Sequence, residues 1–376
     1  LHRDFKRMLA YCTIENIGII GIGTGLGLMG IGTGQTILTI LGFGGALLHV
    51  LNHSLFKSLL FYSAGSVYRQ THTRDMDKLG GLIRHMPKTA LLFLVASVAI
   101  GGIPPFNGFV SEFLIYSGLL AGITTSGISQ MIILIITLAG LAVIGGISVI
   151  TFTKTFGTVF LGNQRQQTEH PATEVPSIML IPQYLIVCIM LLIAFFPGFF
   201  MKTLFGIIDG MGLIQNGYDS SYLVHTTGIM KGVSLSSVIF ILISAAVFLL
   251  RKTLVKGSEN LQSQTWGCGY VNPSVRMQYT GKSFSKSLGK LLNFVVTEKK
   301  SYQELQRNEI FPEKRKYRSF YLDIIDSKIV DPLLYITRRF MNLFQFIQNG
   351  RIQAYVIYGI VFIMLIFIGT LLNFMK

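Results

Sequence analysis

The chain has 376 residues, of which 51% are hydrophobic and only 13% charged, and its mean hydropathy is positive at +0.56. Its formal net charge is +15, but the charges lie between apolar stretches, which is typical of a membrane protein and argues against nucleic-acid binding. The cysteines (Cys12, Cys188 and Cys268) form no CxxC pair, so the sequence predicts neither an iron–sulfur cluster nor a zinc site.

Several apolar stretches reach the roughly 20 residues that cross a bilayer, so the sequence predicts an all-α polytopic membrane helix bundle. The chain begins at Leu1 in a basic segment that leads directly into the first stretch, without a signal-peptide pattern. We therefore expect a fragment whose upstream part is missing. About seven spans are predicted, near residues 7–29, 35–66, 88–122, 130–160, 178–200, 229–250 and 353–374.

The first two spans carry ionisable side chains at membrane depth, where they are costly and usually functional. Lys6 lies at the mouth of the first span, and Glu15 lies nine residues deeper. In the second span, LLHVLNHSLFKSLLF places His49, His53 and Lys57 at steps of four, along one helix face. Histidine changes its charge near neutral pH, and a lysine held away from water releases its proton reversibly. This row therefore suits a proton path.

The third span is longer than one crossing needs, and its middle reads GGIPPFNGF. Prolines remove backbone donors and glycines permit sharp turns, so we predict a helix that is broken at membrane depth. Such breaks are tolerated where the freed backbone faces protein or a wet cavity, as in transport sites. The residues expected to form the break are Gly101, Gly102, Pro104, Pro105 and Gly108.

Two more charges follow, Glu112 just after the break and Lys154 near the end of the fourth span. Each charge also has a simpler explanation, because a lysine near a span end extends to the interface and a carboxylate after a break caps the new helix. For Lys6 and Lys154 the sequence leaves conduction and extension to the interface open. A metal site at the histidine pair is disfavoured, because no third ligand is evident and the neighbouring lysine repels cations. Recurrence in four successive spans favours a proton relay of Lys6, Glu15, His49, His53, Lys57, Glu112 and Lys154.

Loop charge orients the spans. Basic residues outnumber acidic ones before the first span, after the second span and over residues 251–350, so these segments are predicted to be cytoplasmic. The loop after the first span and segment 121–130 carry no charge and are predicted to be outside; charge leaves the loop after the fourth span undecided. Residues 318–348 mix apolar and basic positions, which predicts an amphipathic helix on the membrane surface or against neighbouring subunits. The turn-rich segment 265–284 is equally typical of an ordered loop and of a solvated linker.

Three segments, DFKRMLAYCTIENIG, HVLNHSLFKSLLF and GGIPPFNGFVSEF, resemble the antiporter-like proton-translocating subunits of respiratory complex I and its relatives, over most of residues 1–160. Later segments such as KTFGTVFLGNQR and IQNGRIQAYVIYGI resemble the group 4 membrane-bound hydrogenase branch, which includes hydrogenase-4 and formate hydrogenlyase. The family's lateral helix would fall within roughly residues 300–350. A glutamate after the break is found in only some members of the family. The residues that match the family's relay positions are Lys6, His49, His53, Lys57 and Glu112.

The resemblance implies a non-catalytic, proton-translocating subunit of a respiratory hydrogenase or NADH dehydrogenase-like complex in the cytoplasmic (inner) membrane, with no cofactor of its own. Its partners would be other membrane subunits, through them a peripheral hydrogenase or dehydrogenase arm, and the lipid bilayer, but no nucleic acid. A subunit of a multi-component sodium/proton antiporter and a membrane anchor without conduction are the alternatives. The family's upstream half is missing, so the expected regions are part of the translocating module (1–160), further spans (161–250), a cytoplasmic loop with the lateral helix (251–350) and a last span (351–376).

Overall fold

The structure is a computed structural model, and its contacts divide the chain into two units, Leu1–Ser287 and Leu288–Lys376. Among the described residues, seven helices are long and apolar enough to cross a membrane, which confirms the predicted all-α polytopic bundle. The structure describes residues 2–165, 172–213, 220–255, 268–269, 274–275, 277–293, 295–302, 318–348 and 350–374.

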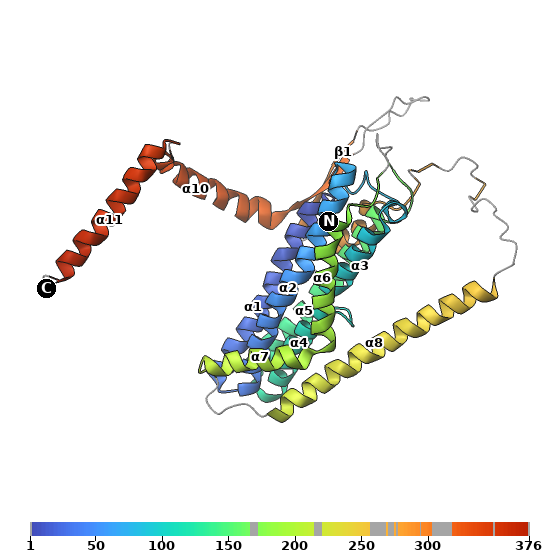
Figure 1. Cartoon of the computed structure of the whole chain (residues 1–376), viewed down its shortest axis with the longest axis horizontal. Coiled ribbons are helices and arrows are strands. Elements are labelled where there is room, and N and C mark those ends of the chain that lie inside the picture. Colours follow the sequence, from blue (N-terminus) through green and yellow to red (C-terminus); the bar gives the residue numbers. More distant parts are fainter. Residues whose placement is uncertain are drawn as a thin grey trace. The chain divides into compact units, whose positions relative to one another are not determined.

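The first unit is built around one long helix, α2, which packs against α1, α3, α4, α6 and α7 (Figure 1). In the apolar membrane-spanning stretch of α2, 61% of the residues are buried, compared with 17% in that of α5. Helix α2 is therefore the most buried of the seven candidate spans. Helix α9 begins in this unit and ends in the next. The helices are α1 (Phe5–Thr33), α2 (Thr36–Thr71), η1 (Leu82–Arg84), α3 (Pro87–Ile100), α4 (Asn107–Thr125), α5 (Ile128–Val159), α6 (Ser177–Phe195), α7 (Pro197–Gly210), α8 (Ser220–Leu254) and α9 (Gly281–Leu291).

Helices α1 and α2 pack backbone against backbone through glycines. A Cβ on Gly42 of α2 would lie 2.3 Å from the Gly27 nitrogen of α1, so no larger residue fits there. The turn between the two helices is equally tight, because Gly34 ends α1 in the left-handed conformation with φ of 68°. At the other end of α1, the Asp4 side chain accepts a hydrogen bond from the Arg7 backbone N–H at 2.9 Å and so caps the helix. This packing fixes the side chains of α1 against those of α2.

The predicted helix break is confirmed. Helix α3 ends at Ile100, α4 begins at Asn107, and the intervening residues include the Pro104–Pro105 peptide bond, which is cis. The third predicted span therefore consists of two separate helices, of which α3 has only 14 residues. Gly108 lets their ends meet, since a Cβ there would lie 1.9 Å from the Ala99 carbonyl oxygen.

The fifth predicted span, near residues 178–200, is shorter than expected. Helix α6 stops at Phe195, and a separate helix, α7, starts with Pro197 at its first position. Proline is favoured there because its missing N–H would be unpaired anyway. Figure 1 shows α7 lying across one end of the bundle, where Phe205 packs on Gly44 of α2.

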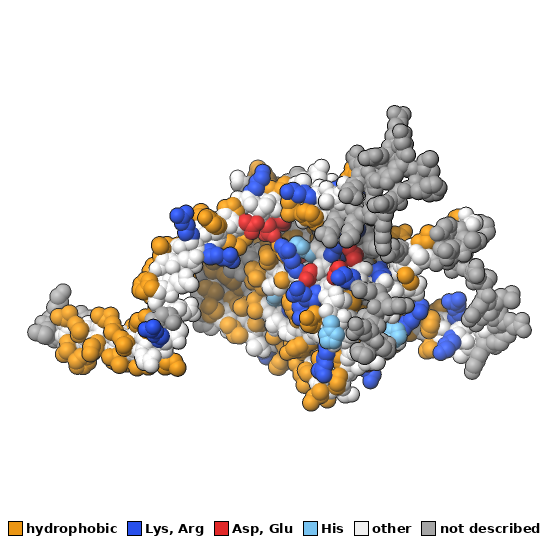
Figure 2. Space-filling view, turned by 90° about the horizontal axis from the view of Figure 1, so that it is seen from above, with side chains coloured by type: hydrophobic (Ala, Val, Ile, Leu, Met, Phe, Trp, Pro, Cys, Tyr) orange, Lys and Arg blue, Asp and Glu red, His pale blue; other side chains and the backbone are white. Residues whose placement is uncertain are grey.

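The charged loops meet at one end of the first unit, as their predicted placement on one side requires. Asp4 pairs with Asp75 in a β-bridge, and the Arg3 guanidinium lies 3.2 Å from the Asp77 carboxylate. Figure 2 views this end, where basic and acidic side chains gather. The segment after α8 joins them, because the Gly281 N–H donates to Asp77 at 3.3 Å. This surface is called the charged end below.

The predicted topology places two exposed residues on opposite sides of the membrane: Lys78 at the charged end and Thr124 at the end of α4. After the native cysteines are replaced by serine, Lys78→Cys is expected to react with an impermeant maleimide only from the cytoplasmic side. Thr124→Cys is expected to react only from the outside. Labelling is measured in sealed vesicles of each orientation. Labelling of both positions from the same side of the membrane would contradict the predicted topology.

The described part of the second unit holds an antiparallel strand pair, two α-helices and two short helical turns. Strands β1 and β2 pair antiparallel, with Val296 opposite Asp323. The predicted amphipathic helix over 318–348 is wrong at both ends, because its first six residues form β2 and α10 ends at Asn342. The alternating RSFYLD segment suits a strand once a partner strand is present. The elements are β1 (Val296–Ser301), β2 (Arg318–Asp323), η2 (Asp326–Val330), α10 (Asp331–Asn342), η3 (Gln345–Ile347) and α11 (Ile352–Phe374).

Two predictions fall partly outside the described residues. Residues 265–267, 270–273 and 276 of the predicted loop over 265–284 are not described, and neither are residues 303–317 of the expected lateral-helix region. The last predicted span corresponds to α11 (Ile352–Phe374).

Candidate functional site

Lys57 lies near the middle of the first unit, with only 6% of its surface exposed. Its Nζ atom donates a hydrogen bond to the backbone carbonyl of Leu9 in α1 and lies 5.7 Å from the ring centroid of Phe61. Among the described residues no carboxylate forms an ion pair with Lys57, although Glu15 lies within electrostatic range. A neutral carbonyl therefore holds this amine, and a carbonyl accepts from both the charged and the neutral amine.

Glu15 connects α1 to the helix break. Its carboxylate lies near the Ser148 hydroxyl of α5. That hydroxyl lies 3.5 Å from the carbonyl oxygen of Ile100, the last residue of α3. The sequence-predicted Glu15 is thus placed between Lys57 and the break.

Glu112 lies at the other side of the same break and is 9% exposed. Its carboxylate packs on Gly102, where a Cβ would lie 2.5 Å from Oε2, and Glu15 lies within electrostatic range of it. The N-cap residue of α4 is Phe106, whose side chain forms no cap hydrogen bond. The two carboxylates therefore converge on the break.

His49 is fully buried between three helices. Its Nε2 atom lies 3.1 Å from Oδ1 of Asn16 in α1, and its Nδ1 atom lies 3.0 Å from Oγ of Ser111 in α4. The ring therefore bridges the helix that carries Glu15 to the helix that carries Glu112.

Two asparagines join α2 to the start of α4. The Asn52 Nδ2 atom donates to the Asn107 backbone carbonyl at 2.7 Å and to Ser111 Oγ at 2.9 Å, and Asn107 Nδ2 donates to Asn52 Oδ1 at 3.0 Å. The sequence pattern did not predict these neutral residues. One signal was available, since Asn16, Asn52 and Ser111 each directly adjoin an ionisable residue in the sequence.

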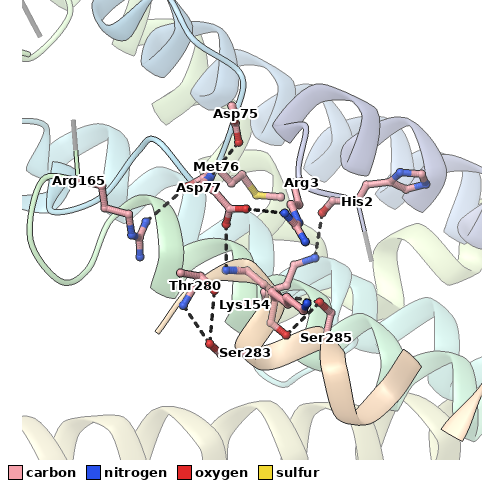
Figure 3. A network of polar contacts seen from close by, with 12 residues as sticks. His2, Arg3, Asp75, Met76, Asp77, Lys154, Arg165, Thr280, Ser283 and Ser285 are labelled. Atoms are coloured by element: carbon pink, nitrogen blue, oxygen red, sulfur yellow. Dashed lines mark hydrogen bonds and ion pairs between the residues drawn. The ribbon is translucent and has the colours of Figure 1, made fainter. Parts of the chain in front are cut away.

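The remaining predicted residues lie apart from this group. His53 is partly buried and edge-on to Phe56, and its Nε2 atom has no hydrogen-bond partner among the described residues. Lys6 is partly exposed, and its Nζ atom lies 4.6 Å from the ring centroid of Tyr68. Lys154 is only 3% exposed, and its Nζ atom donates to the His2 carbonyl at 3.1 Å (Figure 3). Lys154 is therefore buried under the charged end.

Arg165 ties the loops of the charged end together. Its guanidinium donates to the backbone carbonyls of Leu79, Thr158 (2.7 Å) and Tyr279 (2.8 Å). Partial burial lowers the pKa of Arg165, and the nearby Asp77 opposes that shift. Figure 3 shows this side chain pointing toward Met76 in the loop between α2 and α3. The loop whose side was undecided by charge is thereby placed at the charged end.

Residues 1–145, which carry α1 to α4 and most of α5, match the family described as NADH:quinone oxidoreductase/Mrp antiporter, TM. This part of the chain is therefore similar to antiporter-like membrane subunits. Hydrogenase-4 component B of Escherichia coli K12 is 27% identical over 373 residues, which cover 98% of this chain and 55% of that protein. Formate hydrogenlyase subunit 3 of the same strain is 38% identical over 179 residues, covering 48% of this chain and 29% of that protein. The chain is thus related to hydrogenase-4 component B, which confirms the resemblance inferred from its motifs.

A solved structure has the same fold over nearly the whole chain. A chain of the membrane-bound sulfane sulfur reductase, an archaeal respiratory membrane complex, aligns with a TM-score of 0.51 and 18% identity. The match covers 97% of this chain and 56% of that one. The chain therefore spans about half the length of hydrogenase-4 component B and of this structural relative.

Proposed function

We propose that the chain is the proton-translocating, non-redox membrane subunit of a respiratory hydrogenase or NADH dehydrogenase-like complex in the cytoplasmic membrane. One observation carries this proposal: Lys57, His49 and Glu112 are buried in largely apolar helices, and Glu15 lies between Lys57 and a helix break that Glu112 contacts. Ionisable groups at membrane depth mark proton and ion pathways. Their convergence on a break, where backbone groups need polar partners, fits a translocation path.

Each buried group has a distinct role in the proposed relay. Lys57 takes up and releases the proton, because its partner is a neutral carbonyl that does not fix its charge. Glu112 exchanges that proton at the break, and His49 connects the two through neutral amide and hydroxyl contacts. Lys154 passes protons from the charged end toward this group. Electron transfer in partner subunits drives the cycle by changing the relative stability of the charged and neutral forms.

The partners of the proposed subunit are other membrane subunits and, through them, a peripheral hydrogenase or dehydrogenase arm. The sodium/proton antiporter alternative is supported by the family's own description, which names both kinds of protein. We favour the hydrogenase assignment because similarity to hydrogenase-4 component B extends over 98% of the chain, well beyond residues 1–145. A nickel–iron hydrogenase large subunit encoded beside this chain supports our choice, whereas antiporter components alone overturn it.

Replacing Glu112 by glutamine tests the relay directly. Glutamine keeps the shape of the side chain but cannot ionise, so we expect proton pumping per assembled complex to fall by about 100-fold, the usual contribution of a proton-transfer group. Assembly should persist, because glutamine does not enlarge the side chain that packs on Gly102. The measurement is pH-dye quenching in vesicles that contain the complex.

The matched control is Asp209→Asn, which removes an exposed carboxylate from α7 and should leave pumping unchanged. Pumping at the wild-type rate in Glu112→Gln would remove this residue from the path. Pumping that requires added sodium in the wild-type complex would favour the antiporter alternative, and the absence of pumping in the assembled wild-type complex would leave a membrane anchor.

A further inference from the structure

The hydrogen-bond partners of His49 determine which ring nitrogen carries the proton. Asn16 Nδ2 donates to the Cys12 backbone carbonyl at 2.8 Å, and a carbonyl only accepts, so the orientation of this amide is fixed. The other end of the amide, Oδ1, then faces His49 Nε2 at 3.1 Å and also only accepts. His49 Nε2 therefore carries a hydrogen. In the neutral ring, Nδ1 is consequently bare and needs a donor.

Ser111 is positioned to be that donor, but its hydroxyl has a second acceptor in reach. The Asn52 amide orientation is fixed by the Asn107 carbonyl, so Asn52 Nδ2 donates to Ser111 Oγ at 2.9 Å. The single hydroxyl hydrogen then points either to His49 Nδ1 or to the Gly108 carbonyl, each at 3.0 Å. A hydroxyl has one hydrogen and two lone pairs, so the two acceptors compete for it.

The two hydroxyl orientations correspond to the two charge states of His49. When the ring is neutral, the Ser111 hydroxyl donates to Nδ1. When Nδ1 gains a proton, it donates to Ser111 Oγ, and the hydroxyl hydrogen turns to the Gly108 carbonyl. His49 then gains one proton and one positive charge, Ser111 keeps its own proton, and no heavy atom has to move.

We propose that Ser111 is a positioning residue that lets the buried His49 ring carry a second proton, by rotating its hydroxyl between His49 and the first turn of α4. This inference deepens the proposed proton relay and rests on it only for its physiological use. Polar contacts to the ring come from neutral groups, Asn16 and Ser111. The other ionisable residues of the packed helices are Lys6, Arg7, Tyr11, Cys12 and Glu15 on α1, His53, Lys57, Tyr62, Tyr68 and Arg69 on α2, and Glu112 and Tyr116 on α4.

The same rotation couples the charge of His49 to the hydrogen bonding at the helix break. Gly108 is the second residue of α4, directly after the break, and its carbonyl gains the hydroxyl only when His49 is charged. Asn52 holds the hydroxyl oxygen in place throughout, because it also binds the Asn107 carbonyl at the start of α4. The proton state of α2 is therefore coupled to the hydrogen bonding of α4.

The test compares Ser111→Thr with Ser111→Val, which have nearly the same shape and differ in the hydroxyl. The native membrane complex is labelled with nitrogen-15 histidine, and the His49 signals are assigned by their loss in His49→Asn. In the wild type, solid-state NMR is expected to show the neutral ring protonated on Nε2. Across a pH series, Ser111→Val is expected to lower the ratio of doubly to singly protonated His49 by about fivefold or more relative to Ser111→Thr, because a charged donor then lacks its acceptor.

Ser97→Ala is the matched control, since the Ser97 hydroxyl is also buried but donates only to Phe93 of its own helix. This control should leave the His49 signals unchanged. A neutral ring protonated on Nδ1, or equal protonation in the Thr and Val variants, would overturn the proposal whether or not the complex pumps. A lowered protonated fraction with normal pumping would support the role of Ser111 and instead remove His49 from the proposed relay.

Discussion

Replacing Lys57 by alanine is expected to lower proton pumping by about 100-fold or more while the complex still assembles. Among the described residues, this amine is the one buried lysine that contacts α1, and its loss leaves no amine there to exchange the proton. The complex should still assemble, because Leu9 lies inside α1, where its carbonyl also accepts a backbone hydrogen bond of the helix. Pumping and the amount of assembled complex are measured in the same vesicles.

Two further variants sharpen this expectation. Lys57→Arg should fail as well, because a guanidinium stays protonated and cannot pass its proton on. Lys202→Ala removes an exposed lysine from α7 and should pump at the wild-type rate. Pumping by Lys57→Ala at the rate of the Lys202→Ala control would exclude Lys57 from the path.

The second large effect is expected from Gly108→Ala, which should destabilise the subunit before it affects proton transfer. The added Cβ would lie 1.9 Å from the Ala99 carbonyl oxygen, and that atom belongs to the backbone of α3. The ends of α3 and α4 must then separate, and overpacking of this kind costs about 1–3 kcal/mol or more. A lower melting temperature of the purified complex and a lower yield of assembled complex are the expected readouts.

Gly140→Ala provides the comparison, because the described residues leave nothing within 4 Å of a Cβ at this position in α5. Alanine also favours helix over glycine, so that variant should be as stable as the wild type or slightly more so. Equal melting temperatures for the two variants would mean that the ends of α3 and α4 are not in tight contact.

Much of the fold follows from local sequence signals. Hydropathy locates the membrane helices, because each is long and apolar by itself, and the run Gly101–Gly108 locates the break through the backbone chemistry of its prolines and glycines. The steps of four from His49 to Lys57 likewise identify the buried face of α2. These features need no knowledge of neighbouring helices.

The rest depends on tertiary packing, which single-residue chemistry does not reveal. Serines in apolar helices usually donate to a carbonyl one turn earlier, as Ser97 does. Ser111 occupies a similar sequence context, yet it also meets His49 and Asn52 because α2 and α4 pack together there. The strand β2 was missed for the same reason, since it depends on pairing with β1.

The glycine contacts between α1 and α2 determine which parts of the bundle are free to move. Where Gly42 meets Gly27, no side chains intervene that could adopt new rotamers, so the two helices move together as one rigid body. In the proposed relay, the distances from Lys57 to Leu9 and from His49 to Asn16 are therefore expected to change little during turnover. Helix α4 also packs closely on α2, because a Cβ on Gly45 would lie 2.7 Å from Ile115. Any change in the access of the proposed relay to the two sides of the membrane is therefore expected in the segment between α3 and α4.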